Sequence, residues 1–208
     1  MPVRVADNPL IQHKLGILRS QDATYAEFRA AANDVAMLLL CEAAVKLPGE
    51  ARLTRGWAGM VPVTAICESR ITFVPILRAG LGFMEGALRM LPGAGVSIVG
   101  LCRNEQRLEP TEYYVNLVPE IQDRLAIILD PMLATGGSAL ACIDILKKAG
   151  CANICALHLV CAPEGLERVS SAHPEVDIFT AAIDERLNEA GYILPGLGDA
   201  GDRLFGTT

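Results

Sequence analysis

Four continuous apolar runs set the pattern of this chain, and they alternate with segments whose apolar positions recur at helical spacing. A continuous apolar run is typical of a strand buried on both faces, as in a parallel sheet. The pattern therefore predicts an α/β fold with a mostly parallel central sheet flanked by helices. The predicted strands are residues 71–77, 95–101, 125–129 and 153–160.

Smaller elements are predicted around this sheet. Thr24 and Glu27 have the spacing of a capping box, which marks the start of a helix. We find neither an internal repeat nor a linker, so residues 1–208 are expected to form a single domain. The remaining predicted elements are an arm with a short helix at 1–22, a helix from Thr24 to about Val45, a β-hairpin at 51–68, helices at 81–91 and 163–171, and a last core strand at 176–181.

The stretch LAIILDPMLATGGSA, residues 125–139, places candidate chemistry at the end of one predicted strand. Asp130 follows the strand, and a Gly-rich loop at 135–138 comes next. A helical pattern runs from Ala139, and Gly150 is expected to end it as a C-cap. Open α/β sheets bind ligands at the carboxyl ends of their strands, where a helix start offers free N–H groups to a phosphate. The stretch lacks both the Lys of the GxxxxGK[ST] loop and G-x-G-x-x-G spacing, so it predicts a phosphate site of another kind.

Two arginines follow other predicted strands. Arg78 comes after residues 71–77 on a Gly-bearing turn, where a cation is well placed to bind a diphosphate. Arg103 lies in a charged segment, 102–110, that has neither helical nor strand periodicity. We expect this segment to be a long mobile loop that returns through 113–117 as a β-arm, and loops of this length are often lids.

Composition narrows the possible functions. The net charge of −6 argues against a nucleic-acid partner. No apolar run approaches the ~18 residues of a membrane helix, and no signal peptide is apparent, so we expect no membrane partner and a cytoplasmic protein. The seven cysteines lack C-x-x-C spacing and predict neither a zinc site nor a full disulfide framework. Most should be buried, Cys102 should be the most exposed, and His158 should be a satisfied core histidine.

Two segments resemble a known family. The stretch at 125–139 is similar to the 5-phosphoribosyl-1-diphosphate (PRPP) motif of type I phosphoribosyltransferases. Most of that superfamily has a second acid where this chain has Pro131, and the DPMLATGGS form resembles uracil phosphoribosyltransferases. The tail GYILPGLGDAGD, residues 191–202, resembles the uracil-binding segment of the same family. The similarity runs from about Asn8 to Thr207.

The resemblance implies a type I phosphoribosyltransferase fold with three functional parts. These are a PRPP-binding core at 71–160, a flexible β-arm or lid at 102–117, and a small base-binding hood at 183–208. It implies that Asp130 holds the ribose hydroxyls and that Arg78 and Arg103 neutralise the leaving diphosphate. The implied PRPP-binding residues are Arg78, Arg103, Asp130, Pro131, Met132, Leu133, Ala134, Thr135, Gly136, Gly137, Ser138 and Asp199, of which Arg78, Arg103, Asp130 and Asp199 are catalytic.

The hood is expected to recognise uracil mainly through backbone groups. The resemblance implies that Tyr192 flanks the base and that Asp199 orients PRPP and the base near the reacting carbon. It also implies that Ile193, Gly198 and Ala200 bind uracil through their main chain. The many glycines of residues 191–206 predict no regular element, although the apolar side chains there argue against disorder.

The implied reaction converts uracil and PRPP to UMP and diphosphate for pyrimidine salvage. The resemblance implies Mg²⁺ held mainly by PRPP and waters, with no dedicated protein metal site. It also suggests that GTP activates the enzyme and that the chain forms a homodimer or larger homo-oligomer. The alternative is a regulator with a phosphoribosyltransferase fold that binds RNA or DNA and uses PRPP as an effector.

Overall fold

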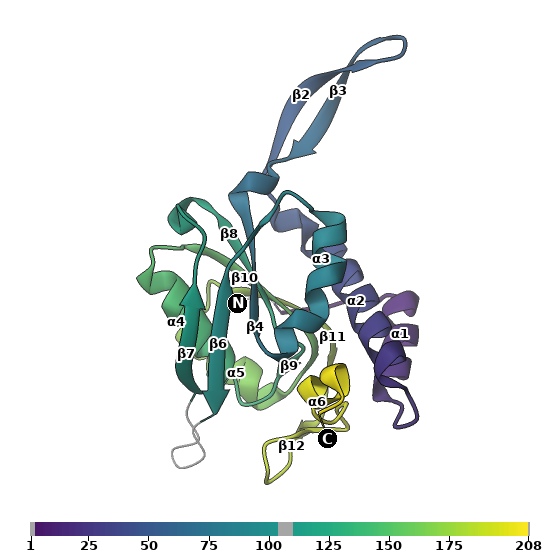
Figure 1. Cartoon of the computed structure of the whole chain (residues 1–208), viewed down its shortest axis with the longest axis vertical. Coiled ribbons are helices and arrows are strands. Elements are labelled where there is room, and N and C mark those ends of the chain that lie inside the picture. The colour runs from purple at the N-terminus through teal and green to yellow at the C-terminus, as the bar shows by residue number, and fades with distance from the viewer. Residues whose placement is uncertain (1–2, 104–109, 208) are drawn as a thin grey trace.

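A mixed sheet forms the centre of the computed structural model, which describes residues 3–103 and 110–207 except for the side chain of Arg103 (Figure 1). Within those residues its strands follow the order β1-β11-β10-β8-β4-β6-β7, with β5 beside β4 and β9 beside β10. Its strands are β1 (Val3–Val5), β4 (Ile71–Leu77), β5 (Gly95–Val96), β6 (Ile98–Arg103), β7 (Pro110–Asn116), β8 (Leu125–Leu129), β9 (Met132–Leu133), β10 (Asn153–Cys161) and β11 (Asp177–Ile183).

The sheet is mostly parallel, as predicted. Among its described pairings, only β6 with β7 is antiparallel. The central strands β4 and β8 are buried along almost their whole length, which explains why both appear in the sequence as unbroken apolar runs.

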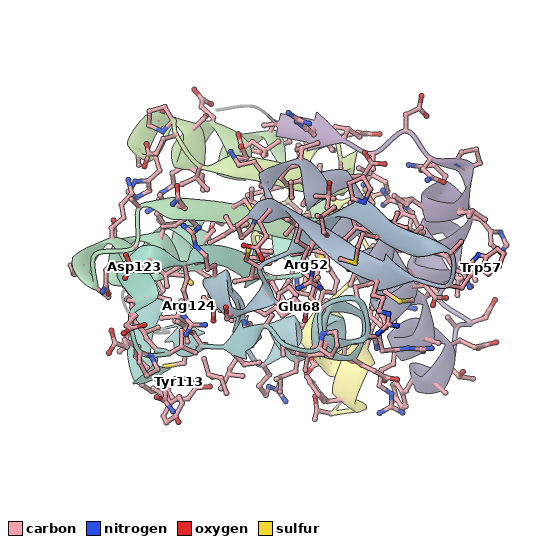
Figure 2. The ribbon with its side chains drawn as sticks, turned by 90° about the horizontal axis from the view of Figure 1, so that it is seen from above. Arg52, Trp57, Glu68, Tyr113, Asp123 and Arg124 are labelled. Carbon is pink, nitrogen blue, oxygen red and sulfur yellow. The ribbon has the colours of Figure 1, made fainter. Side chains whose placement is uncertain are left out.

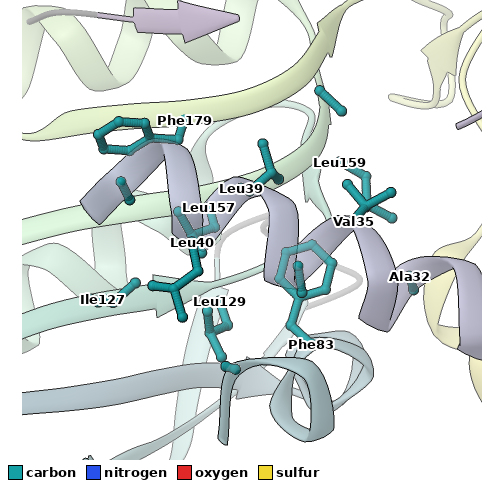
Figure 3. Close-up of a cluster of buried hydrophobic side chains, with 14 of the residues drawn as sticks. Ala32, Val35, Leu39, Leu40, Phe83, Ile127, Leu129, Leu157, Leu159 and Phe179 are labelled. Atoms are coloured by element: carbon teal, nitrogen blue, oxygen red, sulfur yellow. The ribbon is translucent and has the colours of Figure 1, made fainter. Parts of the chain in front are cut away.

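Helices cover both faces of the sheet. Buried side chains of α1, α2 and α3 form one core with Phe73, Ile127 and Leu157, and buried side chains of α4 and α5 form a second core on the other face. Figure 3 shows the first core, with Val35, Leu39 and Leu40 of α2 among side chains from the strands. The helices are α1 (Pro9–Arg19), α2 (Tyr25–Glu42), α3 (Met84–Met90), α4 (Gly137–Lys148), α5 (Pro163–Ala172) and α6 (Ala200–Phe205).

The capping box at the start of α2 is confirmed. The backbone N–H of Glu27 donates to Thr24 Oγ1 at 3.3 Å, and the N–H of Thr24 donates to Glu27 Oε2 at 2.8 Å. These two bonds satisfy donors that a helix start otherwise leaves unpaired. Of the helices in the described ranges, none combines the length and apolar character needed to cross a membrane.

A separate two-stranded arm, β2 (Gly49–Gly56) paired with β3 (Gly59–Ile66), projects from the body (Figure 1). It confirms the predicted hairpin. Figure 2 looks down on the arm, with Arg52 along it and Trp57 at its tip. Most of its residues are exposed on both faces.

Three predicted elements need correction. The segment 102–110 was expected to be a loop, but β6 continues to Arg103 and β7 begins at Pro110; residues 104–109 lie outside the described part of the chain. The helix expected at 81–91 starts as a 3-10 helix, η3 (Ala79–Phe83), because the chain turns tightly after β4 before α3 begins. Short 3-10 helices also lie at η1 (Ala43–Lys46), η2 (Glu68–Arg70) and η4 (Ile121–Asp123).

The tail at 191–206 was expected to have no regular element, and this prediction is wrong. It contains the helix α6 and the strand β13 (Ile193–Leu194), which pairs with β12 (Arg186–Leu187). Asp199 caps α6 by accepting a hydrogen bond from the backbone N–H of Asp202, and Gly206 ends the helix at φ 67°. The glycines therefore mark the ends of a short helix as well as turns.

Candidate active site

The strand ends that carry Arg78 and Asp130 are neighbours. Strand β4 pairs with β8 so that Pro75 lies opposite Leu129, and each strand is followed at once by one of these two residues. The chain order of the sheet also reverses here, since β6 lies on one side of β4 and β8 lies on the other. Ligands of open α/β sheets bind at such a switch point.

The loop after β8 is shaped to receive an anion. Gly136 has φ 78°, a conformation that favours glycine, and it is the N-cap of α4 without a side-chain capping bond. The first N–H groups of α4 are therefore available to a ligand, and the positive end of the helix dipole adds to their attraction for phosphate. A small cavity of about 70 Å³ is lined by Asp130 and by residues 132–139.

The turn after β4 approaches the end of β8 very closely. A Cβ on Gly80 would lie 2.3 Å from the carbonyl oxygen of Leu129, so only glycine fits there. The peptide bond between Leu77 and Arg78, where this turn begins, is cis. The close approach of Gly80 to Leu129 brings the turn that carries Arg78 next to the strand end that Asp130 follows.

Burial raises the pKa of the Asp130 carboxyl to about 7, although the backbone N–H of Met132 donates a hydrogen bond to it and opposes the shift. The residue is only 8 % exposed. Its charge is therefore easily lost near neutral pH in the free protein. A ligand that donates hydrogen bonds to the carboxylate, as a pair of ribose hydroxyls does, stabilises the charged form.

His158 supports the same loop from within the sheet. Its Nδ1 lies 2.6 Å from the backbone carbonyl oxygen of Asp130, and burial lowers its pKa to about 4. At neutral pH the ring is therefore neutral, with Nδ1–H donating to that carbonyl. Its Nε2 is buried and has no hydrogen-bond partner among the described residues. The prediction that His158 is a core histidine with its hydrogen bonds satisfied is therefore confirmed for Nδ1 and wrong for Nε2.

A second cavity, of about 280 Å³, lies between the loop that follows β8 and the hood, residues 183–208. It is lined by Ala79 after β4, by Asp130, Met132 and Ala134 after β8, and by eight residues of the hood. All five residues expected to bind uracil are among them. The hood residues are Ala190, Gly191, Tyr192, Ile193, Gly198, Asp199, Ala200 and Gly201.

Of the two arginines predicted to bind the diphosphate, the structure describes the side chain of only one. The side chain of Arg78 is 56 % exposed beside this cavity. The backbone of Arg103 ends β6 opposite Pro110, whereas its side chain lies outside the described part of the chain. Next to it, Cys102 and Pro110 line a cavity of about 190 Å³ together with Thr135, Gly137 and Ser138 of the loop. A larger cavity, of about 470 Å³, lies at the opposite edge of the sheet, where β8 and β10 begin.

An ion pair that the sequence did not reveal fixes the hood to the body. Arg19 of α1 donates to both carboxylate oxygens of Asp184, at 2.9 and 2.6 Å, and also to the carbonyl oxygen of Gly196. Asp184 in turn accepts a hydrogen bond from the N–H of Gly196 at 2.8 Å. The only sequence signal for Asp184 was its position just after the last core strand. The buried carboxylate thereby holds the turn at Gly196, which lies between the two hood segments that line the cavity of about 280 Å³.

The cysteines follow the prediction with one exception. Cys142, Cys151, Cys155 and Cys161 are buried, which agrees with their apolar surroundings in the sequence. Cys102 is exposed as expected, but Cys41 near the end of α2 is exposed as well.

The acidic groups of the site suit an ion that arrives with a substrate. Within the described residues no three His, Cys, Asp or Glu side chains cluster as metal ligands. Asp130 and Asp199 are the acids that line the cavity of about 280 Å³. Mg²⁺ is commonly bound by one or two carboxylates together with substrate phosphates and waters, so this pair fits such an ion.

The fold is that of type I phosphoribosyltransferases, an α/β fold with a mostly parallel sheet flanked by helices. The uracil phosphoribosyltransferase family model matches residues 5–207, and the chain belongs to that family. It is 41 % identical to the AQ2163 protein from Aquifex aeolicus, with a TM-score of 0.94 over 100 % of this chain and 99 % of that one.

More distant structures share the fold alone. One is the adenine phosphoribosyl transferase from Trypanosoma brucei, solved with AMP, pyrophosphate and ribose-5-phosphate, with 10 % identity and a TM-score of 0.59 over 91 % of this chain and 86 % of that one. Another is a hypoxanthine-guanine phosphoribosyltransferase from Bacillus anthracis, with 10 % identity and a TM-score of 0.51 over 77 % of this chain and 80 % of that one.

Proposed function

We propose that this phosphoribosyltransferase acts on uracil, converting uracil and PRPP to UMP and diphosphate. The observation that carries the proposal is the cavity of about 280 Å³ that Asp130 shares with the hood. Its hood wall is built from Gly-rich main chain, with Gly191 and Gly198 at positive φ. Backbone N–H and C=O groups have fixed donor and acceptor roles, which suits a base that presents alternating carbonyls and an N–H on one edge.

The reaction forms one bond and breaks one bond at the same carbon. N1 of uracil attacks C1 of the ribose, and the bond from C1 to the diphosphate oxygen breaks with its electron pair leaving on diphosphate. The N1 proton passes to solvent. Charge builds on the leaving diphosphate, and Arg78 and Arg103 neutralise it. Ionised Asp130 accepts hydrogen bonds from the ribose hydroxyls, and the first turn of α4 binds the 5′-phosphate.

Positioning supplies much of the rate in this scheme. The transition state resembles an oxocarbenium ion, so the site needs aligned reactants and a stabilised leaving group more than a strong base. Asp199 orients the two substrates at the reacting carbon, and Tyr192 covers the base. Mg²⁺ bound together with PRPP would supply positive charge to the diphosphate, and Asp130 and Asp199 are the carboxylates that would help to hold it.

The direct test is formation of UMP from PRPP and uracil, with hypoxanthine as a competing base and Mg²⁺ present or chelated. UMP formation that requires Mg²⁺ is expected. Nucleotide formation from hypoxanthine alone would contradict the proposal. The same assay with GTP varied tests the expected activation, and an RNA-binding assay beside it tests the regulator alternative. The cytoplasm stays the expected compartment.

We also propose that two copies of this chain associate through the arm. The arm exposes apolar side chains on both faces, and a two-stranded hairpin is only marginally stable alone in water. Residues 49–66 carry Arg52 and Arg55 against one acid, Glu50, on a chain of net charge −6, so the arm complements the rest of a second copy. Its exposed large apolar residues are Leu53, Trp57, Met60, Val61, Val63 and Ile66.

Replacing Leu53 and Met60, which share one face of the arm, with Glu should convert the dimer to a monomer in sedimentation at micromolar concentration. The matched control is Val45→Glu, an equally exposed apolar position outside the arm, and it should remain dimeric. A wild-type monomer at that concentration, or a doubly substituted chain that stays dimeric, would contradict the proposal.

A further inference from the structure

The C-terminal helix α6 lies directly against the turn that follows β4. A Cβ on Gly82 of η3 would fall 2.6 Å from Cδ1 of Leu204, so the two segments lie in close contact there. Leu204 is buried and belongs to the same core as Phe83. The turn that carries Arg78 and the helix that closes the hood are therefore packed as one unit.

The side chain of Arg78 makes two contacts among the described residues, and both are with α6. Its Nη2 lies 3.4 Å from Asp202 Oδ1, and its guanidinium carbon lies 5.8 Å from the ring centroid of Phe205. An ion pair this exposed contributes little to the stability of the fold. Its effect is instead to restrict where the guanidinium lies.

Asp202 accepts a second hydrogen bond and is connected to the base cavity. The Thr207 hydroxyl donates to Asp202 Oδ1, the same oxygen that faces Arg78. The backbone N–H of Asp202 donates to Asp199 Oδ1 at 3.0 Å, and Asp199 lines the cavity. A continuous set of contacts thus runs from the base cavity through Asp202 to Arg78.

Resting on the proposed function, we propose that Asp202 is a positioning residue that orients Arg78 for the diphosphate of PRPP. An arginine side chain has five N–H donors, and Asp202 engages one nitrogen, which leaves the others for the diphosphate. A free arginine loses considerable rotamer freedom when it binds a ligand. Asp202 restricts that freedom before PRPP arrives, so less binding energy is lost on ordering the side chain.

The test begins with Asp202→Asn, which retains the size of the side chain and an acceptor for Thr207. We expect kcat/KM for PRPP to fall about tenfold, with KM for uracil unchanged within twofold. Asp202→Glu retains a carboxylate and should recover most of the loss. The matched control is Thr207→Ala, which removes the other donor to the same oxygen, and it should stay within twofold of wild type.

A double-mutant cycle separates positioning from support of the fold. If Asp202 acts through Arg78, Asp202→Asn has no further effect on kcat/KM for PRPP in the Arg78→Ala background. An equal fold-loss in both backgrounds, or wild-type kinetics for Asp202→Asn, would overturn the proposal. The cycle can be repeated with Phe205→Leu, which leaves the contacts of Asp202 in place. We expect this change to lower kcat/KM for PRPP about twofold, and the loss should again disappear in the Arg78→Ala background.

Calorimetric titration with PRPP and Mg²⁺, without any base, measures the same effect independently of base choice. Wild-type protein that binds PRPP but forms no UMP would contradict the proposed function. The PRPP affinities of wild type and Asp202→Asn could still be compared in that case. Unchanged PRPP affinity in Asp202→Asn, together with unchanged kinetics, would contradict the positioning role alone.

Discussion

At the scale of single residues, the buried carboxyl of Asp130 should control the pH dependence of the enzyme. Burial raises its pKa to about 7. In the proposed mechanism, the ionised form of Asp130 accepts hydrogen bonds from the ribose. We therefore expect kcat/KM for PRPP to fall about tenfold per pH unit below pH 7 and to level off above it. The folded protein binds this proton more tightly than the unfolded chain does, so the group also stabilises the ligand-free protein at low pH. This stabilisation is lost as the pH rises from about 4 to about 7.

The variant Asp130→Asn should remove that inflection and lower kcat about a hundredfold or more, because an amide donates where the ribose hydroxyls need an acceptor. Steady-state kinetics between pH 5.5 and 8.5 measure both effects. A flat profile for wild type, or near wild-type kcat/KM in the variant, would show that Asp130 does not bind the ribose.

Arg78→Ala and Arg103→Ala should each lower kcat/KM for PRPP by about a hundredfold, since each removes a charged donor to the leaving diphosphate. The KM for uracil should change little. Arg70→Ala is the matched control, because Arg70 is an exposed arginine directly before β4 whereas Arg78 directly follows it. An effect confined to the KM for uracil would refute the assigned role of that arginine.

At the scale of elements, Asp184→Asn should loosen the hood. The change leaves Arg19 without its bidentate partner, and a lost hydrogen bond to a charged group costs about 2 kcal/mol of unfolding free energy. It should also raise KM for uracil, because Asp184 holds Gly196, which lies between the two hood segments that line the cavity. Denaturant unfolding and steady-state kinetics measure the two effects. Glu185→Gln, at an exposed position, is the control, and equal behaviour of both variants would contradict the anchoring role.

The elements predicted well from sequence are those with one dominant local signal. Apolar runs marked β4 and β8, and the Thr24–Glu27 capping box marked the start of α2. Helix α6 was missed because its six residues are too few to show a period, and the glycines around it suggested only turns. Strand β1 was missed because three residues form a strand only when β11 is available to pair with them.

At the scale of the whole molecule, the two walls of the site come from distant parts of the chain. The sequence predicted which residues line the base cavity, through the family resemblance, and the adjacency of strand ends followed from the parallel sheet. It did not predict contacts such as Arg19 with Asp184, separated by 165 residues, or Arg78 with Asp202, separated by 124. Pairs of this kind have no characteristic spacing, and only the folded chain brings them together.

The central claim is that the hood recognises uracil by fixed backbone donors and acceptors. Cytosine replaces the C4 carbonyl with an amino donor and turns N3 into an acceptor, so matched contacts become mismatched ones. A site of this kind rejects the wrong pattern by about 10⁴-fold, since buried polar groups are left unpaired. Orotate should fail as well, because its carboxylate needs a cation and the described residues that line the cavity include none. By contrast, 5-fluorouracil keeps the pattern of uracil.

The most direct measurement is kcat/KM for uracil, 5-fluorouracil, cytosine and orotate under identical PRPP and Mg²⁺ concentrations. We expect uracil and 5-fluorouracil to be converted at similar rates, and cytosine and orotate to be slower by about 10⁴-fold or more. Comparable kcat/KM for cytosine or orotate would contradict backbone recognition of uracil by the hood.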